Sequence, residues 1–251
     1  MKELLDNRVL GAIRWIDAAT LTPIALPLVV RSDHLRFSRN LSGLTVIRGG
    51  DGLDAYTRAF DLETLSPGDR PATAALTLQG TVEDPTGAYL PTAFSVALPR
   101  DDSPALLPPD QHRPPNSVFQ PIDVALLPAP SVRLPPGAAE VRVLILDAAH
   151  RPIRNALARV VATQGNLILG CGLADTRGET LVAITGLRHF GPGATADAVV
   201  TVETEARLEV IRPPADATTV DWLALRNAPV AAGDTDPVPL RLKPGALISR
   251  L

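Results

Sequence analysis

Residues 141–187 read VRVLILDAAHRPIRNALARVVATQGNLILGCGLADTRGETLVAITGL, and this stretch decides the fold. Val141, Val143 and Ile145 occupy every second position, which is the period of a β-strand with one buried face. The run stops at residues 147–152, DAAHRP, where an Asp side chain can bond the backbone ahead of it and a proline fixes φ. The stretch therefore opens with a strand followed by a tight turn.

The same alternation returns further along the stretch. Ala156, Ala158 and Val160 form a second alternating face, and residues 175–178, DTRG, supply another turn with glycine where a positive φ is needed. The strand pattern resumes at residues 181–184. We therefore predict that residues 141–187 form four short strands separated by turns, a spacing typical of a small antiparallel sandwich.

These residues also carry a family resemblance. The order strand, Asp turn with Pro-Ile, strand, Ala-Asp-Thr-Arg-Gly-Glu, strand, Ile-Thr-Gly-Leu resembles the carboxypeptidase-regulatory-like family. Where that family has glycines, after the Asp turn and before the second strand, this chain has His150 and Asn155. The resemblance implies a seven-stranded Greek-key sandwich related in shape to transthyretin, and a structural or adhesive module rather than an enzyme.

Asp-turn patterns recur outside this stretch, near Asp17 and Asp84 as well as Asp147. They indicate duplication, either of half a sandwich or of a whole domain. We therefore predict an all-β chain of two tandem Greek-key sandwich domains, Ig-like or transthyretin-like, with long Pro-rich loops. The predicted parts are a domain at residues 1–128, a Pro-rich linker at 129–138 and a carboxypeptidase-regulatory-like domain at 139–251. In the last of these we expect one or two further short strands, around residues 222–225 and at 238–242.

Composition excludes several classes of protein. The chain has 251 residues, of which 25 are proline and 45% are hydrophobic, so we expect a folded protein with many Pro-marked loops. Cys171 is the single cysteine, which rules out an internal disulfide. A net charge of −3 favours no nucleic-acid partner. We expect no membrane span and no Sec signal peptide, and hence cytoplasmic synthesis.

Local motifs for catalysis are missing from the sequence. The four histidines, at positions 34, 112, 150 and 189, are too far apart to form a local metal-ligand pair. Hydrolase and nucleotide-binding motifs do not occur. Intradiol dioxygenases and hydroxyisourate hydrolases share a comparable sandwich, but this chain lacks the His-x-His of the former and the terminal Tyr-Arg-Gly-Ser of the latter. We therefore predict a protein that is not an enzyme and has no catalytic residue, cofactor, metal site or evident small-molecule substrate.

The Pro-rich segment 99–115 forms a long excursion that cannot be a central strand. We expect Leu106 and Leu107 to contact another protein subunit, because a loop this long gains nothing inside a lone domain. The alternative is that these leucines fold back onto their own sandwich. The whole pattern is similar to small baseplate or tail-associated proteins of contractile phage-tail-like injection systems. It predicts a structural subunit incorporated into such a particle; the alternatives are a monomeric ligand-binding or adhesion module and, third, an enzyme.

Overall fold

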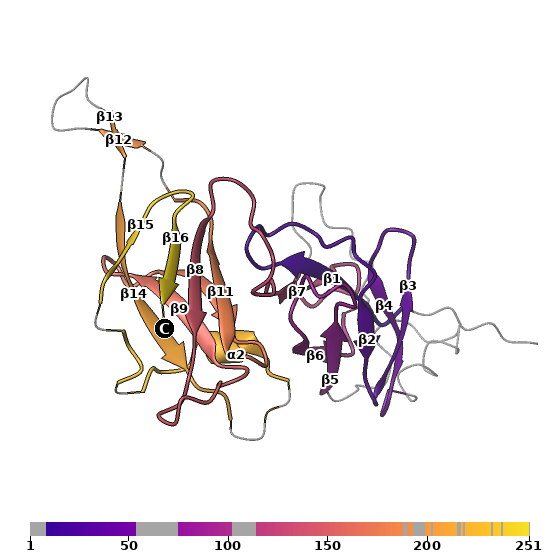
Figure 1. Ribbon diagram of the computed structural model, residues 1–251. Helices are drawn as coiled ribbons and strands as arrows, with labels where there is room; N and C mark the ends of the chain where they lie inside the picture. The colour runs from indigo at the N-terminus through magenta and orange to yellow at the C-terminus, as the bar shows by residue number, and fades with distance from the viewer. Residues whose placement is uncertain are drawn as a thin grey trace, which may run out of the picture. The chain divides into compact units, whose positions relative to one another are not determined.

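The computed structural model describes residues 9–53, 75–101, 114–187, 190–192, 199–201, 203–214, 217, 219–231, 233–236 and 238–250. Its described elements are strands apart from one short helix (Figure 1). None of its described helices is both long and apolar enough to span a membrane. The predicted all-β fold with two sandwich units is confirmed.

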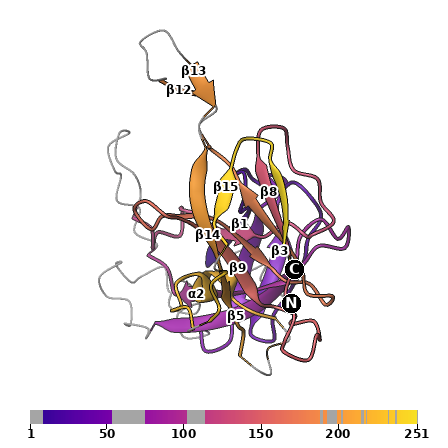
Figure 2. The ribbon, with the colours of Figure 1, turned by 60° about the vertical axis from the view of Figure 1, so that its left-hand side comes forward.

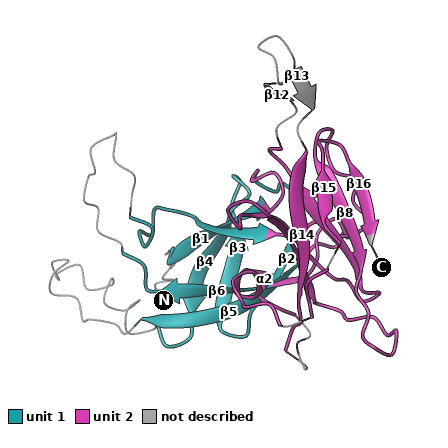
Figure 3. Cartoon of the chain, turned by 90° about the vertical axis from the view of Figure 1, so that its left-hand side faces the viewer, with its two compact units in different colours: residues 1–16, 23–83, 93–125 teal, residues 17–22, 84–92, 126–251 magenta. Residues whose placement is uncertain are grey.

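The chain divides into two compact units, which Figure 3 draws in different colours. Unit 1 comprises Met1–Ile16, Pro23–Glu83 and Ala93–Ala125, and unit 2 comprises Asp17–Thr22, Asp84–Thr92 and Leu126–Leu251. Each unit has its own sheets and its own buried core.

Unit 1 is a sandwich of two sheets. Its strands are β1 (Gly11–Asp17), β2 (Val29–Arg31), β3 (Leu35–Arg39), β4 (Thr45–Gly50), β5 (Leu76–Glu83), β6 (Thr92–Leu98) and β7 (Ile122–Leu126). One sheet has the order β3-β4-β1-β7 and the other β2-β5-β6. Aromatic side chains join the two sheets, since the rings of Trp15 on β1 and Phe94 on β6 meet edge to face at 5.4 Å. Within the first sheet, Trp15 Nε1 donates to Thr45 Oγ1 of β4 at 2.9 Å.

Unit 2 is the second sandwich. Its strands are β8 (Ala139–Leu144), β9 (Leu157–Ala162), β10 (Ile168–Leu173), β11 (Glu179–Ile184), β12 (Phe190–Pro192), β13 (Val199–Thr201), β14 (Thr204–Ile211), β15 (Leu240–Leu242) and β16 (Leu247–Arg250). The β8 sheet has the order β11-β8-β16, and the β9 sheet has the order β10-β9-β14-β15. Figure 2 shows β9, β14 and β15 of the β9 sheet. Apolar side chains from both sheets form one buried cluster, including Val141 and Val182 from the first and Val160 and Leu208 from the second.

The four strands predicted within residues 141–187 are present as β8, β9, β10 and β11. β8 has the expected alternation, because Val141 and Val143 are buried and the residues between them are half-buried. β9 differs, since Leu157 and Val161 on its second face are buried as well. The helix α2 (Trp222–Arg226) packs against β9 and helps to bury this second face.

The predicted Asp turns are confirmed. The carboxylate oxygens of Asp17, Asp84, Asp147 and Asp175 each accept backbone N–H groups two to five residues ahead. Gly178 has the expected positive φ of 77°. His150 and Asn155, which replace family glycines, both adopt φ of 59°, so this chain keeps the left-handed backbone at those positions.

The turn at Asp84 is the most enclosed of these, and we expect its loss to be costly. Asp84 is 9% exposed and accepts hydrogen bonds from the N–H groups of Thr86, Ala88 and Tyr89 and from Thr86 Oγ1. Asp84→Ala leaves these donors without their partner, and we expect a loss of about 2 kcal/mol of unfolding free energy. Urea unfolding measures it. Asp147→Ala, in a more exposed turn, is the control; an equal loss in both would contradict the burial argument.

Two parts of the C-terminal segment differ from the sequence-based expectation. The strand expected around Trp222 is wrong, because residues 222–226 form α2, capped by Asp221, whose side chain accepts from the N–H groups of Leu223 and Ala224. β15 lies within the second expected strand at residues 238–242. β16 was not expected, and it closes the β8 sheet in parallel with β8.

The Pro-rich residues 129–138 lie in unit 2, which takes up the chain at Leu126. Arg142 on β8 donates to the carbonyl oxygens of Pro130 and Val132, so this segment is held against the sheet. The linker predicted at residues 129–138 stays a prediction. Limited proteolysis checks it, because a linker between two domains is expected to be cut there.

Candidate functional site

The two side chains predicted to contact a partner, Leu106 and Leu107, lie outside the described residues. The contact predicted for segment 99–115 therefore stays a prediction. The described part of unit 2 offers a different candidate, a groove along one edge of the sandwich.

This β8 groove lies where the β8 sheet and the β9 sheet face each other, and its volume is 690 Å³. Val143 and Ile145 line it on one side, and Leu208 and Val210 of β14 line it on the other. Val143, Ile145 and Leu208 are less than 10% exposed, whereas Val210 is only partly buried. The remaining lining residues are Leu144, Leu146, Asp147, His150, Arg212, Gly233, Asp234, Thr235 and Asp236.

β16 covers most of one edge of β8. The described pairing of β16 with β8 runs from Leu247 opposite Glu140 to Arg250 opposite Val143 (Figure 1). Leu144 and Leu146 lie beyond this pairing, at the mouth of the groove. The described residues therefore leave a short end of the edge, next to the groove, without a paired strand.

Backbone hydrogen bonds show which groups face this open edge. Ile145 uses both of its groups on the opposite edge, donating to Gly178 O at 2.9 Å and accepting from the N–H of Ile153 at 3.0 Å. Glu140 N–H, by contrast, donates to Ala246 O at 2.8 Å, toward β16. Because successive residues of a strand point these groups to opposite edges, Leu146 faces the open side. In the described part of the chain neither its N–H nor its C=O makes a hydrogen bond.

The rim of the groove is charged and locally paired. Backbone and side-chain hydrogen bonds from Arg151 lower the pKa of Asp147, and Asp234 raises the pKa of Arg212 through a hydrogen bond at 2.9 Å. These groups are therefore ionised at neutral pH. A carboxylate with a lowered pKa is a poor general acid, so the chemistry of the rim favours recognition rather than proton transfer.

No protein-family model and no curated protein matches this sequence. The chain therefore has no family assignment, and the carboxypeptidase-regulatory-like resemblance of residues 141–187 stays a resemblance. The likenesses that exist are to solved structures, and they concern architecture.

Three solved structures have a distant likeness to this chain. The Bacillus anthracis TIE protein is 8% identical, with 97% of this chain covered, 34% of that chain covered and a TM-score of 0.26. A streptococcal ancillary pilin is 8% identical, with coverages of 96% and 67% and a TM-score of 0.27. The Actinomyces fimbrial adhesin FimA is 13% identical, with coverages of 98% and 82% and a TM-score of 0.25. Likenesses this distant carry no argument about activity or partners.

A second, smaller cavity of 280 Å³ in unit 2 lies beside β10, with Cys171, Trp222 and Arg226 in its lining. Burial raises the pKa of the Cys171 thiol to about 11, although the charges of Arg226 and Arg159 act in the opposite direction. At neutral pH the group is therefore a thiol rather than the more nucleophilic thiolate. This cavity offers apolar contacts and one cationic side chain.

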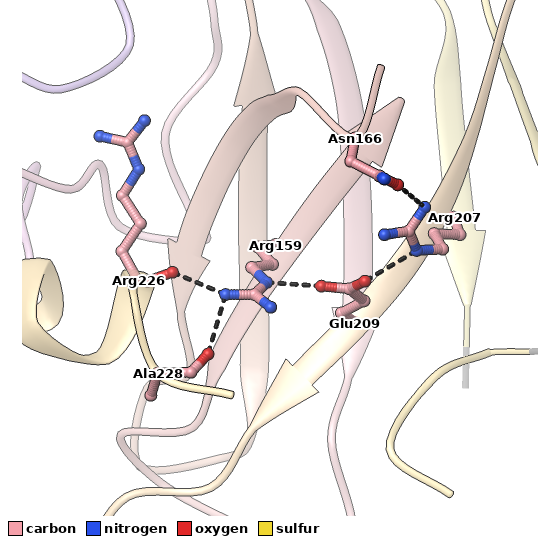
Figure 4. Close-up of polar contacts among 6 residues, drawn as sticks. All are labelled: Arg159, Asn166, Arg207, Glu209, Arg226 and Ala228. Carbon is pink, nitrogen blue, oxygen red and sulfur yellow. Dashed lines mark hydrogen bonds and ion pairs between the residues drawn. The ribbon is translucent and has the colours of Figure 1, made fainter. Parts of the chain in front are cut away.

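A polar cluster formed by side chains of β9 and β14 is drawn in Figure 4. Glu209, whose side chain is 6% exposed, forms ion pairs with Arg159 Nε at 2.5 Å and Arg207 Nε at 2.7 Å. Arg159 also donates to the carbonyl oxygens of Arg226 and Ala228 at 2.7 and 3.1 Å. The Arg226 side chain points away from these residues. The cluster anchors the end of α2 to the β9 sheet, which is a structural role.

Metal ligation has no support within the described ranges, where no group of three His, Cys, Asp or Glu side chains comes together. His34 Nδ1 lies 3.1 Å from Asp51 Oδ2 in an exposed pair, and His150 occupies the left-handed position of the Asp147 turn. Both are read as turn residues. His112 and His189 lie outside the described residues.

Proposed function

We propose that this chain is a non-enzymatic β-sandwich protein that binds other protein subunits and forms part of a larger assembly. The observation that supports the proposal most directly is the β8 groove, which has a volume of 690 Å³ and is lined by Val143, Ile145, Leu208 and Val210. Apolar side chains gathered around a surface groove are typical of a site that contacts another protein.

A subunit of a contractile injection system is the narrower form of this proposal. It rests on two expectations from the sequence. One is the similarity of the whole pattern to subunits of such systems, and the other is the contact expected at Leu106 and Leu107. Incorporation into a particle belongs to the same narrower form.

The test is the mass of the protein as it occurs in its native source. Under mild extraction we expect it to elute with a mass several times the 26.5 kDa of the free chain, because a partner covers its apolar groove. Size-exclusion chromatography with light scattering measures this, and the recombinant chain alone is the control. Elution as a free 26.5 kDa chain from the native source would overturn the assembly proposal.

A monomeric binding module is the second candidate, and the cavity beside Cys171 favours it. In the described part of the chain the Arg226 guanidinium makes no hydrogen bond, and it borders the apolar lining that includes Trp222. An apolar cavity with one orienting charge suits a small ligand that carries a carboxylate. A free chain in the native source would favour this candidate.

A further inference from the structure

The cavity beside Cys171 holds a cationic side chain that lacks an anionic partner in the described part of the chain. Arg226 is only partly exposed, and its guanidinium makes no hydrogen bond or ion pair there. Glu209 is already paired with Arg159 and Arg207. The Arg226 side chain points away from that cluster (Figure 4). A partly buried guanidinium is satisfied best by a carboxylate, which accepts two parallel hydrogen bonds, so we expect the occupant of the cavity to carry one.

The rest of the cavity favours an apolar group. Among its described lining residues only Arg226 is charged, and apolar side chains such as Ile168 and Leu169 lie around it. The hydroxyl of Thr185 already donates to a backbone carbonyl oxygen at 2.9 Å. The volume of 280 Å³ lies just below the range of about 300–1,000 Å³ that is typical of small-molecule sites. The cavity therefore suits one apolar side chain with a carboxylate beside it, rather than a large cofactor.

Large apolar side chains are exposed next to this cavity. Leu21 lines the cavity and is 76% exposed. Two further leucines adjoin lining residues in the sequence, since Leu223 follows Trp222 and Leu167 precedes Ile168, and they are 51% and 65% exposed. Leu223 and Arg226 are three residues apart in α2 and so lie on the same side of the helix. A ligand small enough for the cavity leaves these leucines exposed, whereas a polypeptide that continues out of it can cover them.

The backbone of Leu21 supports a contact at this position. Its φ is 59°, a left-handed conformation that is unfavourable for a residue with a Cβ atom. The surrounding turn imposes it, because Leu21 N–H donates to Asp17 O and the Asp17 carboxylate accepts from the N–H groups of Ala19 and Thr20. Strain of this kind is typical of positions whose side chain serves a binding site.

We propose that the cavity beside Cys171 binds the C-terminal residue of a partner protein, with the terminal carboxylate on Arg226 and the apolar side chain inside the cavity. The end of a chain places a carboxylate and an apolar side chain on one residue, which an internal Asp or Glu does not. The preceding residues of the partner contact Leu21. This inference rests on the proposed function, because it assigns the chemistry of a partner subunit, but it uses a surface other than the β8 groove.

The probes are three fluorescent peptides, Gly-Ser-Thr-Leu, Gly-Ser-Thr-Val and Gly-Ser-Thr-Phe, titrated into the full chain while fluorescence anisotropy is measured. We expect at least one to bind saturably, and its C-terminal amide to bind about tenfold more weakly. Arg226→Gln should raise the dissociation constant of that peptide about tenfold. Arg154→Gln, which removes an exposed arginine of unit 2 outside the cavity, is the matched control and should leave it unchanged.

A small carboxylate distinguishes a partner's chain end from a free ligand. The N-acetylated form of the last amino acid of the tightest peptide has the same carboxylate and side chain but no preceding residues. We expect it to bind at least about tenfold more weakly than the peptide, because it does not reach Leu21. Equal affinity would overturn the chain-end proposal in favour of the monomeric binding module.

Alkylation of Cys171 in the unaltered protein provides a readout that does not depend on how the variants fold. Cys171 is the single cysteine of the chain and lines the cavity, so saturating peptide should slow its reaction with iodoacetamide about tenfold, as mass spectrometry measures. Failure of all three peptides to bind, equal affinity of the amide, equal affinity of the two variants or an unchanged alkylation rate would each overturn the proposal. A high-mass native assembly with any of these results would leave the proposed function standing on another surface.

Discussion

Gly172→Ala is expected to lower the unfolding free energy by about 3 kcal/mol or more, or to prevent folding. A Cβ atom at this position of β10 would lie 2.2 Å from the carbonyl oxygen of Leu181 and 2.7 Å from its carbonyl carbon. Leu181 belongs to β11, whose backbone is fixed by pairing with β8 along its whole length. Backbone atoms in a ladder cannot move aside as the end of a flexible side chain can.

Gly170 supports the same reasoning, since its added Cβ would lie 2.5 Å from Ala183 O. The two glycines let β10 of the β9 sheet approach β11 of the β8 sheet, which closes this side of the sandwich. Gly165→Ala is the matched control, because Gly165 has φ of 75° but no atom within 4 Å of an added Cβ. It should cost only about 1 kcal/mol, from the left-handed backbone alone. Urea unfolding of both variants decides, and similar midpoints would refute close approach as the cause.

The turns and the strands they connect could be predicted from local sequence. Asp147 and Asp175 are each followed by residues whose N–H groups the carboxylate accepts, an interaction that spans four residues or fewer. The two partners of such a hydrogen bond are close together in the sequence, so the turn can be predicted from a few residues. The close approach at Gly172 is not, because the atom that excludes a side chain belongs to Leu181 on another strand.

The helix α2 was preceded by a capping signal in the sequence, but the apolar run after it was interpreted as a strand. Residues 222–225, WLAL, are apolar, and a short apolar run does not distinguish a buried strand from a helix. Asp221 immediately before the run is a preferred N-cap, and its side chain does accept from Leu223 N–H and Ala224 N–H. The capping residue Asp221 therefore predicts the helix better than the apolar run predicts a strand.

The β8 groove could be anticipated only in part. Leu144 and Leu146 occupy the alternate positions of the first strand, where a surface strand normally carries polar side chains. That departure from polarity indicated a covered edge or an interface. How far this edge is covered depends on where β16 pairs, and β16 is about a hundred residues away in sequence, so no local pattern could reveal it.

Glu209→Ala is expected to cost about 3–5 kcal/mol, because it leaves two arginines without the carboxylate that neutralises them. The side chain of Arg159 is 13% exposed and that of Arg207 is 34% exposed, so Arg159 bears most of the loss. The carbonyl oxygens of Arg226 and Ala228 still accept from Arg159, but they carry no formal charge. Thermal and urea unfolding measure the change.

The matched control is Glu203→Ala. Glu203 pairs with Lys243 at 2.7 Å, but the two side chains are 38% and 50% exposed, and an exposed pair contributes less than about 1 kcal/mol. A loss at Glu209 no larger than at Glu203 would show that burial of the cluster does not matter.

The dependence of this contribution on pH gives an independent check. Burial raises the pKa of Glu209, but the hydrogen bonds and charges of Arg159 and Arg207 outweigh burial, so the pKa is lowered overall. A carboxyl group with a lowered pKa in the folded state stabilises fully above its unfolded pKa of about 4.3 and loses this effect as pH falls through the folded value. The difference in unfolding free energy between the unaltered protein and Glu209→Gln should therefore be constant near neutral pH and shrink below about pH 4. Subtracting the variant removes the contributions of Asp84 and Asp147, whose pKa values are also lowered. A difference that grows as the pH falls would mean that Glu209 is held protonated, and the ion-pair account of the cluster would be wrong.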